Sequence, residues 1–266
     1  MLKQIVLPLS LVFLLELIYR QAMLEISKES VPEMQDDFET VDGLNEFFTT
    51  VVWLGSVRVL LMLLTVTFML MDKASSMYLW SMSFIVYYLA NILESVYAQQ
   101  RLYMITDEVK STLCYTGFGN PSEEAVVNWF IHTTLFLHAV DRDASYFHRK
   151  PVIRKFITYA WPILGCAFLS LMMFALVTLG ANSFNQVIFG ASLGFTLAMI
   201  SHFWLKPVFL DLQARLTKKQ MTETELGDEV YEDRYMLRVK HLLLVLFLTL
   251  VIPLIVAVIV LKSFGD

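Results

Sequence analysis

Seven apolar stretches constrain what this chain can fold into more than any other feature. A helix needs about 20 residues to cross a hydrocarbon core of ~30 Å, because each residue rises ~1.5 Å. The composition excludes an ordinary soluble domain, since 57% of the 266 residues are hydrophobic and only 17% are charged. The sequence therefore predicts an all-α, polytopic membrane helix bundle. The stretches are residues 2–19, 47–71, 76–98, 125–141, 156–179, 184–205 and 241–262.

The two shortest stretches need separate interpretation. Residues 2–19 begin like a signal peptide, because Lys3 precedes an apolar run, but Tyr19-Arg20-Gln21 offers no small-residue cleavage site. We expect a retained helix there. Residues 125–141 carry two histidines, which predicts a position inside the bundle rather than against lipid.

Neither the histidines nor the cysteines have the spacing of a metal site. His132 and His138 are six residues apart, not at the i, i+4 spacing of helical metal ligands. Cys114 and Cys166 form no CxxC pattern and no framework of pairs. We expect no metal, no cofactor beyond a bound phospholipid, and no disulfide scaffold.

The distribution of basic residues predicts the orientation in the membrane. Most Lys and Arg residues fall in segments that lie on one side if the N-terminus is inside, among them residues 142–155 and 206–240. The positive-inside rule then places the N-terminus inside and the C-terminus outside. Three parts are expected: a six-helix core over residues 1–205, an amphipathic and charged connector over 206–240 at the inner face, and a C-terminal transmembrane helix within 241–266.

Two charged features allow alternatives. Residues 20–46 are rich in acids and are expected to form an outer loop, either solvated or a docking surface for a basic partner. Arg58 lies near mid-membrane in the second stretch. It is either part of an ion or proton path, or is held by a buried hydrogen bond or by an acid such as Glu16 or Glu94.

Three short segments stand at helix ends on the predicted outer face. They are residues 94–102 (ESVYAQQRL), 119–125 (GNPSEEA) and 175–190 (ALVTLGANSFNQVIFG). In order and spacing they resemble the three-part signature of the type 2 phosphatidic acid phosphatase superfamily, which also contains glucose-6-phosphatase and the vanadium haloperoxidases. The resemblance covers residues 1 to 205 and implies a six-helix phosphatase-like core.

Residue by residue, the resemblance is incomplete. The first family motif is Lys, six residues, then Arg-Pro, where this chain has Glu94 and Arg101-Leu102. The second is Pro-Ser-Gly-His, where this chain keeps Pro121-Ser122 and continues with Glu123-Glu124.

The third family motif is Ser-Arg, five residues, His, three residues, Asp. Its positions hold Ala175-Leu176, Asn182 and Gln186 here. Glucose-6-phosphatase-like members also carry Gln at the last position.

These departures bear on the chemistry that the resemblance implies. In the family, the third-motif histidine attacks phosphorus and the second-motif histidine protonates the leaving oxygen. Asn182 cannot replace the nucleophile, because its amide nitrogen has a delocalised lone pair. Glu124 stands where the proton donor would be, and could act as a general acid if burial raised its pKa.

Of the three cations that the family places around phosphate, Arg101 alone remains, among carboxylates that would repel a phosphoryl group. We therefore expect Arg101 to pair with Glu94 or Glu124, the alternative being a residual lipid-phosphate site.

The sequence thus favours a pseudoenzyme. The expected function is a non-catalytic membrane scaffold, an accessory subunit of a larger membrane complex such as the mitochondrial respiratory chain or ATP synthase, with other membrane subunits and phospholipids as partners and no nucleic acid. The alternatives are a diverged phosphatase acting on a lipid or sugar phosphate, and a lipid-binding or transport protein. The mitochondrial inner membrane is the favoured location, with the endoplasmic reticulum as the alternative.

Overall fold

Helices make up all the regular structure in the part of the chain that the structure describes. The computed structural model describes residues 2–70, 73–113, 115, 117–140 and 160–210. The chain divides into two compact units, Met1–Leu210 and Asp211–Asp266. The predicted seventh helix and most of the predicted connector belong to the second unit, outside the described residues. The described elements of the first unit are α1 (Leu2–Glu39), α2 (Leu44–Leu54), α3 (Val57–Leu70), α4 (Lys73–Tyr97), α5 (Leu102–Ile105), α6 (Glu123–Val140), α8 (Trp161–Thr178), α9 (Phe184–Ile200) and the π-helical turn η3 (Ser201–Leu205).

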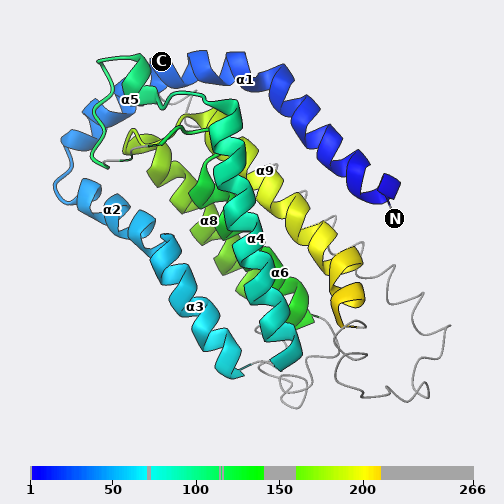
Figure 1. Ribbon diagram of the computed structural model, residues 1–266. Helices are drawn as coiled ribbons and strands as arrows, with labels where there is room; N and C mark the ends of the chain where they lie inside the picture. Colours follow the sequence, from blue (N-terminus) through cyan, green and yellow to red (C-terminus); the bar gives the residue numbers. More distant parts are fainter. Residues whose placement is uncertain (1, 71–72, 114, 116, 141–159, 211–266) are drawn as a thin grey trace, which may run out of the picture. The chain divides into compact units, whose positions relative to one another are not determined.

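The first helix is twice as long as its apolar stretch, so the prediction of an acidic outer loop over residues 20–46 is wrong. Residues 20–39 continue α1, and only 40–43 form a turn before α2. Ion pairs one turn apart, Arg20 with Glu16 and Lys28 with Glu25, support the charged half of the helix. The same half buries Val31 and Met34. Figure 1 shows α1 running along α9 and then across the end of the bundle where α5 lies.

The second predicted span is two helices rather than one. α2 and α3 meet at Gly55-Ser56 with a bend of 46°. The break is held against the bundle, because Asn128 Nδ2 donates a hydrogen bond of 2.6 Å to the Gly55 carbonyl. A Cβ on Gly55 would lie 2.3 Å from Met172 Sδ, so glycine permits this approach. The bend leaves Arg58 in the first turn of α3.

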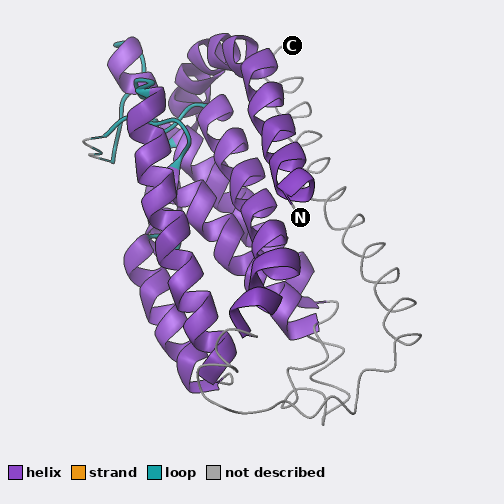
Figure 2. Cartoon of the chain, turned by 45° about the vertical axis from the view of Figure 1, so that its right-hand side comes forward, coloured by secondary structure: helices purple, strands orange, loops and turns teal. Residues whose placement is uncertain are grey.

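The centre of the bundle is the contact between α6 and α9. Two glycines one turn apart on α9 let the backbones approach closely, as small residues do in membrane helix pairs. A Cβ on Gly190 would lie 2.7 Å from the Ser122 carbonyl oxygen, and one on Gly194 would lie 2.2 Å from that of Val126. The first turns of α6 are buried, which confirms that this stretch lies inside the bundle. Figure 2 shows the described residues as helices joined by loops. Around it lies an apolar core that includes Leu64, Leu79, Phe130 and Phe189.

The described helices are those of an integral membrane protein, as predicted. Three of them are long and apolar enough to cross a membrane within Gln4–Glu39, Lys73–Ile105 and Phe184–Leu210. The bent pair α2–α3 makes a fourth crossing if it is counted as one span. α8 is apolar but shorter, and α6 is largely enclosed by its neighbours.

We expect Gly194→Ala to destabilise the bundle by about 1–3 kcal/mol, because the added methyl group meets backbone that cannot move aside. The measurement is the thermal unfolding midpoint of the purified protein in detergent. Gly165→Ala on α8 is the matched control, since a Cβ there has no heavy atom within 4 Å. Equal midpoints for the two variants would show that the α6–α9 contact does not need glycine.

Candidate functional site

The three segments singled out in the sequence lie together at one end of the bundle. The first is the end of α4 and the residues up to Arg101, the second is the turn before α6, and the third is the turn between α8 and α9. Hydrogen bonds join all three: Arg101 bonds to Asn182, and Asn182 bonds to Gly119. Residues far apart in sequence therefore build one polar cluster.

Arg101 is the centre of this cluster and is only 3% exposed. Its Nε donates to the Gly117 carbonyl oxygen at 3.1 Å, and its Nη1 donates to the Ala181 carbonyl oxygen at 3.1 Å and to Asn182 Oδ1 at 3.2 Å. Its Nη2 donates to Glu94 Oε1 at 3.3 Å, so the predicted ion pair with Glu94 is confirmed. All three guanidinium nitrogens are thus bonded to protein acceptors.

Carboxylates and a phenol surround the guanidinium. The Tyr115 ring lies 4.5 Å from the Arg101 guanidinium carbon, in cation–π geometry. Burial raises the pKa of the Tyr115 phenol, and the charge of Glu124 raises it further, so the phenol stays protonated. Glu124 is buried and lies within electrostatic range of Glu94. The cluster therefore has more acidic groups than cations among its described members.

Asn182 and Gln186 fill the space beside Gly119. Asn182 Nδ2 donates to the Gly119 carbonyl oxygen at 3.2 Å and to Gln186 Oε1 at 3.3 Å. Gln186 Oε1 also accepts from the Ser183 backbone N–H at 3.0 Å, as half of a capping box that begins α9. Gln186 Nε2 donates to the Gln100 carbonyl oxygen at 2.9 Å. A Cβ on Gly119 would lie 2.5 Å from Gln186 Oε1, so the two residues are in direct contact.

Ser122 lies directly before α6 and bonds to its first turn. Its hydroxyl lies 3.4 Å from Glu124 Oε2 and accepts from the Ala125 N–H at 3.4 Å. Its own N–H donates to the Gln186 carbonyl oxygen at 3.1 Å. The residue is fully buried, in the position that an N-cap occupies.

A second ion pair next to this cluster was missed by sequence reasoning. Glu16, fully buried on α1, accepts two hydrogen bonds from Arg20 and one of 3.0 Å from Asn120 Nδ2. The Tyr97 hydroxyl lies 3.5 Å from the same carboxylate, and the Tyr97 ring faces Arg20 at 4.8 Å. An acid four residues before an arginine in an apolar run was the available signal.

The other candidates from the sequence lie elsewhere. Arg58 is exposed on α3 and pairs with neither Glu16 nor Glu94, so both predicted partners are wrong. His132 Nδ1 lies 3.0 Å from the Asn128 carbonyl oxygen, and His138 Nδ1 lies 3.4 Å from Lys206 Nζ. Within the described ranges no group of three or more His, Cys, Asp or Glu residues could hold a metal ion. Cys166 is a free thiol, and Cys114 lies outside the described residues.

Comparison with known proteins bears on the fold. No family model matches this chain, and no curated protein matches it. A solved structure is similar to it: the crystal structure of the first transmembrane PAP2 type phosphatidylglycerolphosphate phosphatase from Bacillus subtilis. The TM-score is 0.60 at 18% sequence identity, and the match covers 76% of this chain and 96% of that chain. The chain thus has the fold of a PAP2-type membrane phosphatase, as its three segments predicted.

We expect Arg101→Gln to destabilise the protein by about 3–5 kcal/mol, because it leaves the Glu94 carboxylate buried without its partner. Chemical denaturation in detergent micelles measures the change. Lys110→Gln is the matched control: Lys110 and Glu39 form an ion pair whose side chains are 68% and 52% exposed. An exposed pair contributes at most ~1 kcal/mol. A loss for Arg101→Gln as small as that for Lys110→Gln would contradict a structural role for the guanidinium.

Proposed function

We propose that this chain, which has the fold of a PAP2-type membrane phosphatase, is a catalytically inactive member of that fold. It serves as a membrane scaffold, an accessory subunit of a larger membrane protein complex. Its contacts with other subunits and with phospholipids are made by its helix faces. The diverged phosphatase is the alternative that the experiment below separates from this proposal.

The observation that carries the proposal is that the Arg101 guanidinium is already bonded within the protein. Its three guanidinium nitrogens bond to Glu94, Asn182 and two backbone carbonyl groups. A phosphoryl group would have to displace these acceptors, and it would then lie among carboxylates that repel it. Phosphoryl transfer depends on preorganised positive charge around the transferring group. The charges around Arg101 therefore support a site in which the protein's own groups, rather than a phosphate, bind the guanidinium.

The residues beside Arg101 support the same proposal. Asn182, in the position where the resemblance implies a nucleophilic histidine, is fully buried and has an amide that cannot attack phosphorus. Its oxygen and nitrogen are both engaged, with Arg101, Gly119 and Gln186. Glu124 stands where the resemblance implies the proton donor, and proton transfer alone provides no covalent step.

We further propose that the complex lies in the mitochondrial inner membrane, as part of the respiratory chain or ATP synthase. Support comes from the kind of assembly found there, since large complexes of that membrane contain many accessory subunits. The endoplasmic reticulum is the alternative location. The proposed orientation, N-terminus inside and C-terminus outside, rests on the distribution of Lys and Arg along the sequence.

We expect the purified protein to release no phosphate from lipid or sugar phosphates above the level of the Glu124→Gln variant. The assay measures inorganic phosphate, with the Bacillus subtilis phosphatase and phosphatidylglycerolphosphate as the positive control. Arg101→Gln is a second comparison, valid if it remains folded. Phosphate release that falls at least tenfold in either variant would favour the diverged phosphatase instead.

We also expect the native protein, extracted in mild detergent, to migrate with other membrane polypeptides in fixed stoichiometry, because an accessory subunit is held by its neighbours. Native electrophoresis followed by mass spectrometry measures this. A single monodisperse species of 30.7 kDa would count against the accessory role. Phospholipid retained inside the helix bundle, without protein partners, would favour a lipid-binding protein.

A further inference from the structure

Arg58 is a charged side chain on the outside of a membrane-spanning segment. It stands in the first turn of α3, directly after the break between α2 and α3, and it is exposed. Among the described residues it forms no ion pair, since Glu16 is held by Arg20 and Glu94 by Arg101. The Arg58 guanidinium therefore lies on the surface of α3, where a group outside the described bundle can contact it.

The depth of Arg58 follows from the register of α3 and α4. Trp80 Nε1 donates to the Leu64 carbonyl oxygen, and the Ser76 hydroxyl donates to that of Thr67, so the two helices run antiparallel. This register places Arg58 near the level of Val86, around the middle of Lys73–Tyr97. With a rise of ~1.5 Å per residue, Arg58 lies roughly 18 Å along α3 from Leu70. Half of a hydrocarbon core is ~15 Å, so Arg58 is near the centre of the membrane.

A charge at this depth requires a partner. Ionisable residues in spanning segments almost always face protein or water and pair with another group, because hydrocarbon does not solvate them. A lipid phosphate is a poor match, since phosphates lie at the membrane surface, about 15 Å from the centre of the core. The remaining predicted span, residues 241–262, contains no Asp or Glu and cannot supply a carboxylate.

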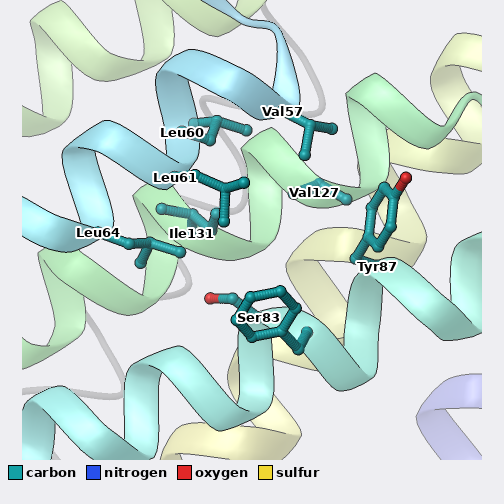
Figure 3. Close-up of a pocket in the computed structure, with 9 residues that line it drawn as sticks. Val57, Leu60, Leu61, Leu64, Ser83, Tyr87, Val127 and Ile131 are labelled. Carbon is teal, nitrogen blue, oxygen red and sulfur yellow. The ribbon is translucent and has the colours of Figure 1, made fainter.

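An apolar pocket lies beside Arg58. It has a volume of about 170 Å³ between α3, α4 and α6, and Val57 and Leu61 on either side of Arg58 in the sequence are among its walls (Figure 3). It reaches the surface, because its wall residues Phe84 and Tyr87 are 51% and 36% exposed. A cavity of about 150 Å³ with apolar walls accommodates benzene. The pocket is therefore large enough for one large apolar side chain.

The pocket also contains a polar group without a partner. The Ser83 hydroxyl is buried, and no hydrogen-bond partner for it is found in the described part of the chain. Ser83 faces the space between α4 and α3 in Figure 3. A buried hydroxyl without a partner is unfavourable and is usually satisfied by another group. In the part of the chain that the structure describes, the surface around Arg58 thus combines a cation without an ion pair, a buried hydroxyl without a partner and an unfilled apolar pocket.

We propose that this surface binds a membrane-spanning helix of another protein. The helix carries an Asp or Glu at mid-membrane depth that pairs with Arg58, and a large apolar side chain beside it enters the pocket. This inference rests on the proposed role as a subunit of a complex and names the chemistry of one neighbour. A carboxylate on a helix is the group that reaches a cation at this depth without leaving the core.

Photocrosslinking in the native membrane tests the proposal. A benzophenone amino acid replaces Met62, which is 67% exposed and one turn from Arg58, or Leu7, which is 72% exposed on α1. The Met62 position should form an adduct with a protein segment that spans the membrane and contains Asp or Glu. Arg58→Gln should reduce that adduct about tenfold or more, as when one member of a desolvated charge pair is removed. Arg58→Lys should retain most of it.

Exchanging the charge of Arg58 with that of the acid on the partner helix is the decisive test. Arg58→Glu combined with the partner acid changed to Arg should restore the Met62 adduct, while either change alone should not. Adducts of Met62 with phospholipid only, a crosslinked segment without an acid, or an adduct unaffected by Arg58→Gln would each overturn the proposal.

The Leu7 position separates this proposal from the accessory role. Protein adducts at Leu7 without any at Met62 would overturn the docking surface and leave the accessory role standing. A lack of protein adducts at both positions, together with a single 30.7 kDa species, would overturn both. An unchanged Leu7 adduct in Arg58→Gln shows that this variant is folded.

Discussion

The buried guanidinium of Arg101 is the interaction on which this end of the bundle depends. It stands just after α4, and its acceptors come from α4 itself, from the segment before α6 and from the turn between α8 and α9. A cation removed from water is stable only where several acceptors compensate for its lost hydration. The three connections are therefore held in one arrangement by a single residue, and the helices that follow them begin from fixed points.

The positions at which the sequence resemblance implies a phosphate site are occupied by side chains that bond to one another. Glu94 supplies a negative charge to Arg101, and the amides of Asn182 and Gln186 bond to each other and to nearby backbone. Each contact is ordinary, yet together they leave few free donors for an anion. A shared fold therefore does not by itself imply a shared reaction, because function depends on the groups at the site.

Much of this arrangement could be predicted from the sequence, and the exceptions have physical causes. Apolar stretches near the length of a membrane span predicted where the helices lie. The resemblance of the motifs predicted that Arg101 lies close to Glu94. Hydropathy could not show that α1 continues through its acidic half, because helix formation there depends on ion pairs and on burial of Val31 and Met34. Hydropathy also could not show the break at Gly55, where the chain contacts Asn128 and Met172 on other helices. Tertiary contacts of this kind leave little trace in the local sequence.

The contact between Gly119 and the Gln186 amide couples two positions that are distant in the chain. Any side chain at 119 would force the Gln186 amide to move, because an added Cβ would lie 2.5 Å from Gln186 Oε1. That movement would weaken the bonds of this amide to the Ser183 N–H and to the Gln100 carbonyl group. The capping box that begins α9 therefore depends on the absence of a side chain at a position in an earlier loop.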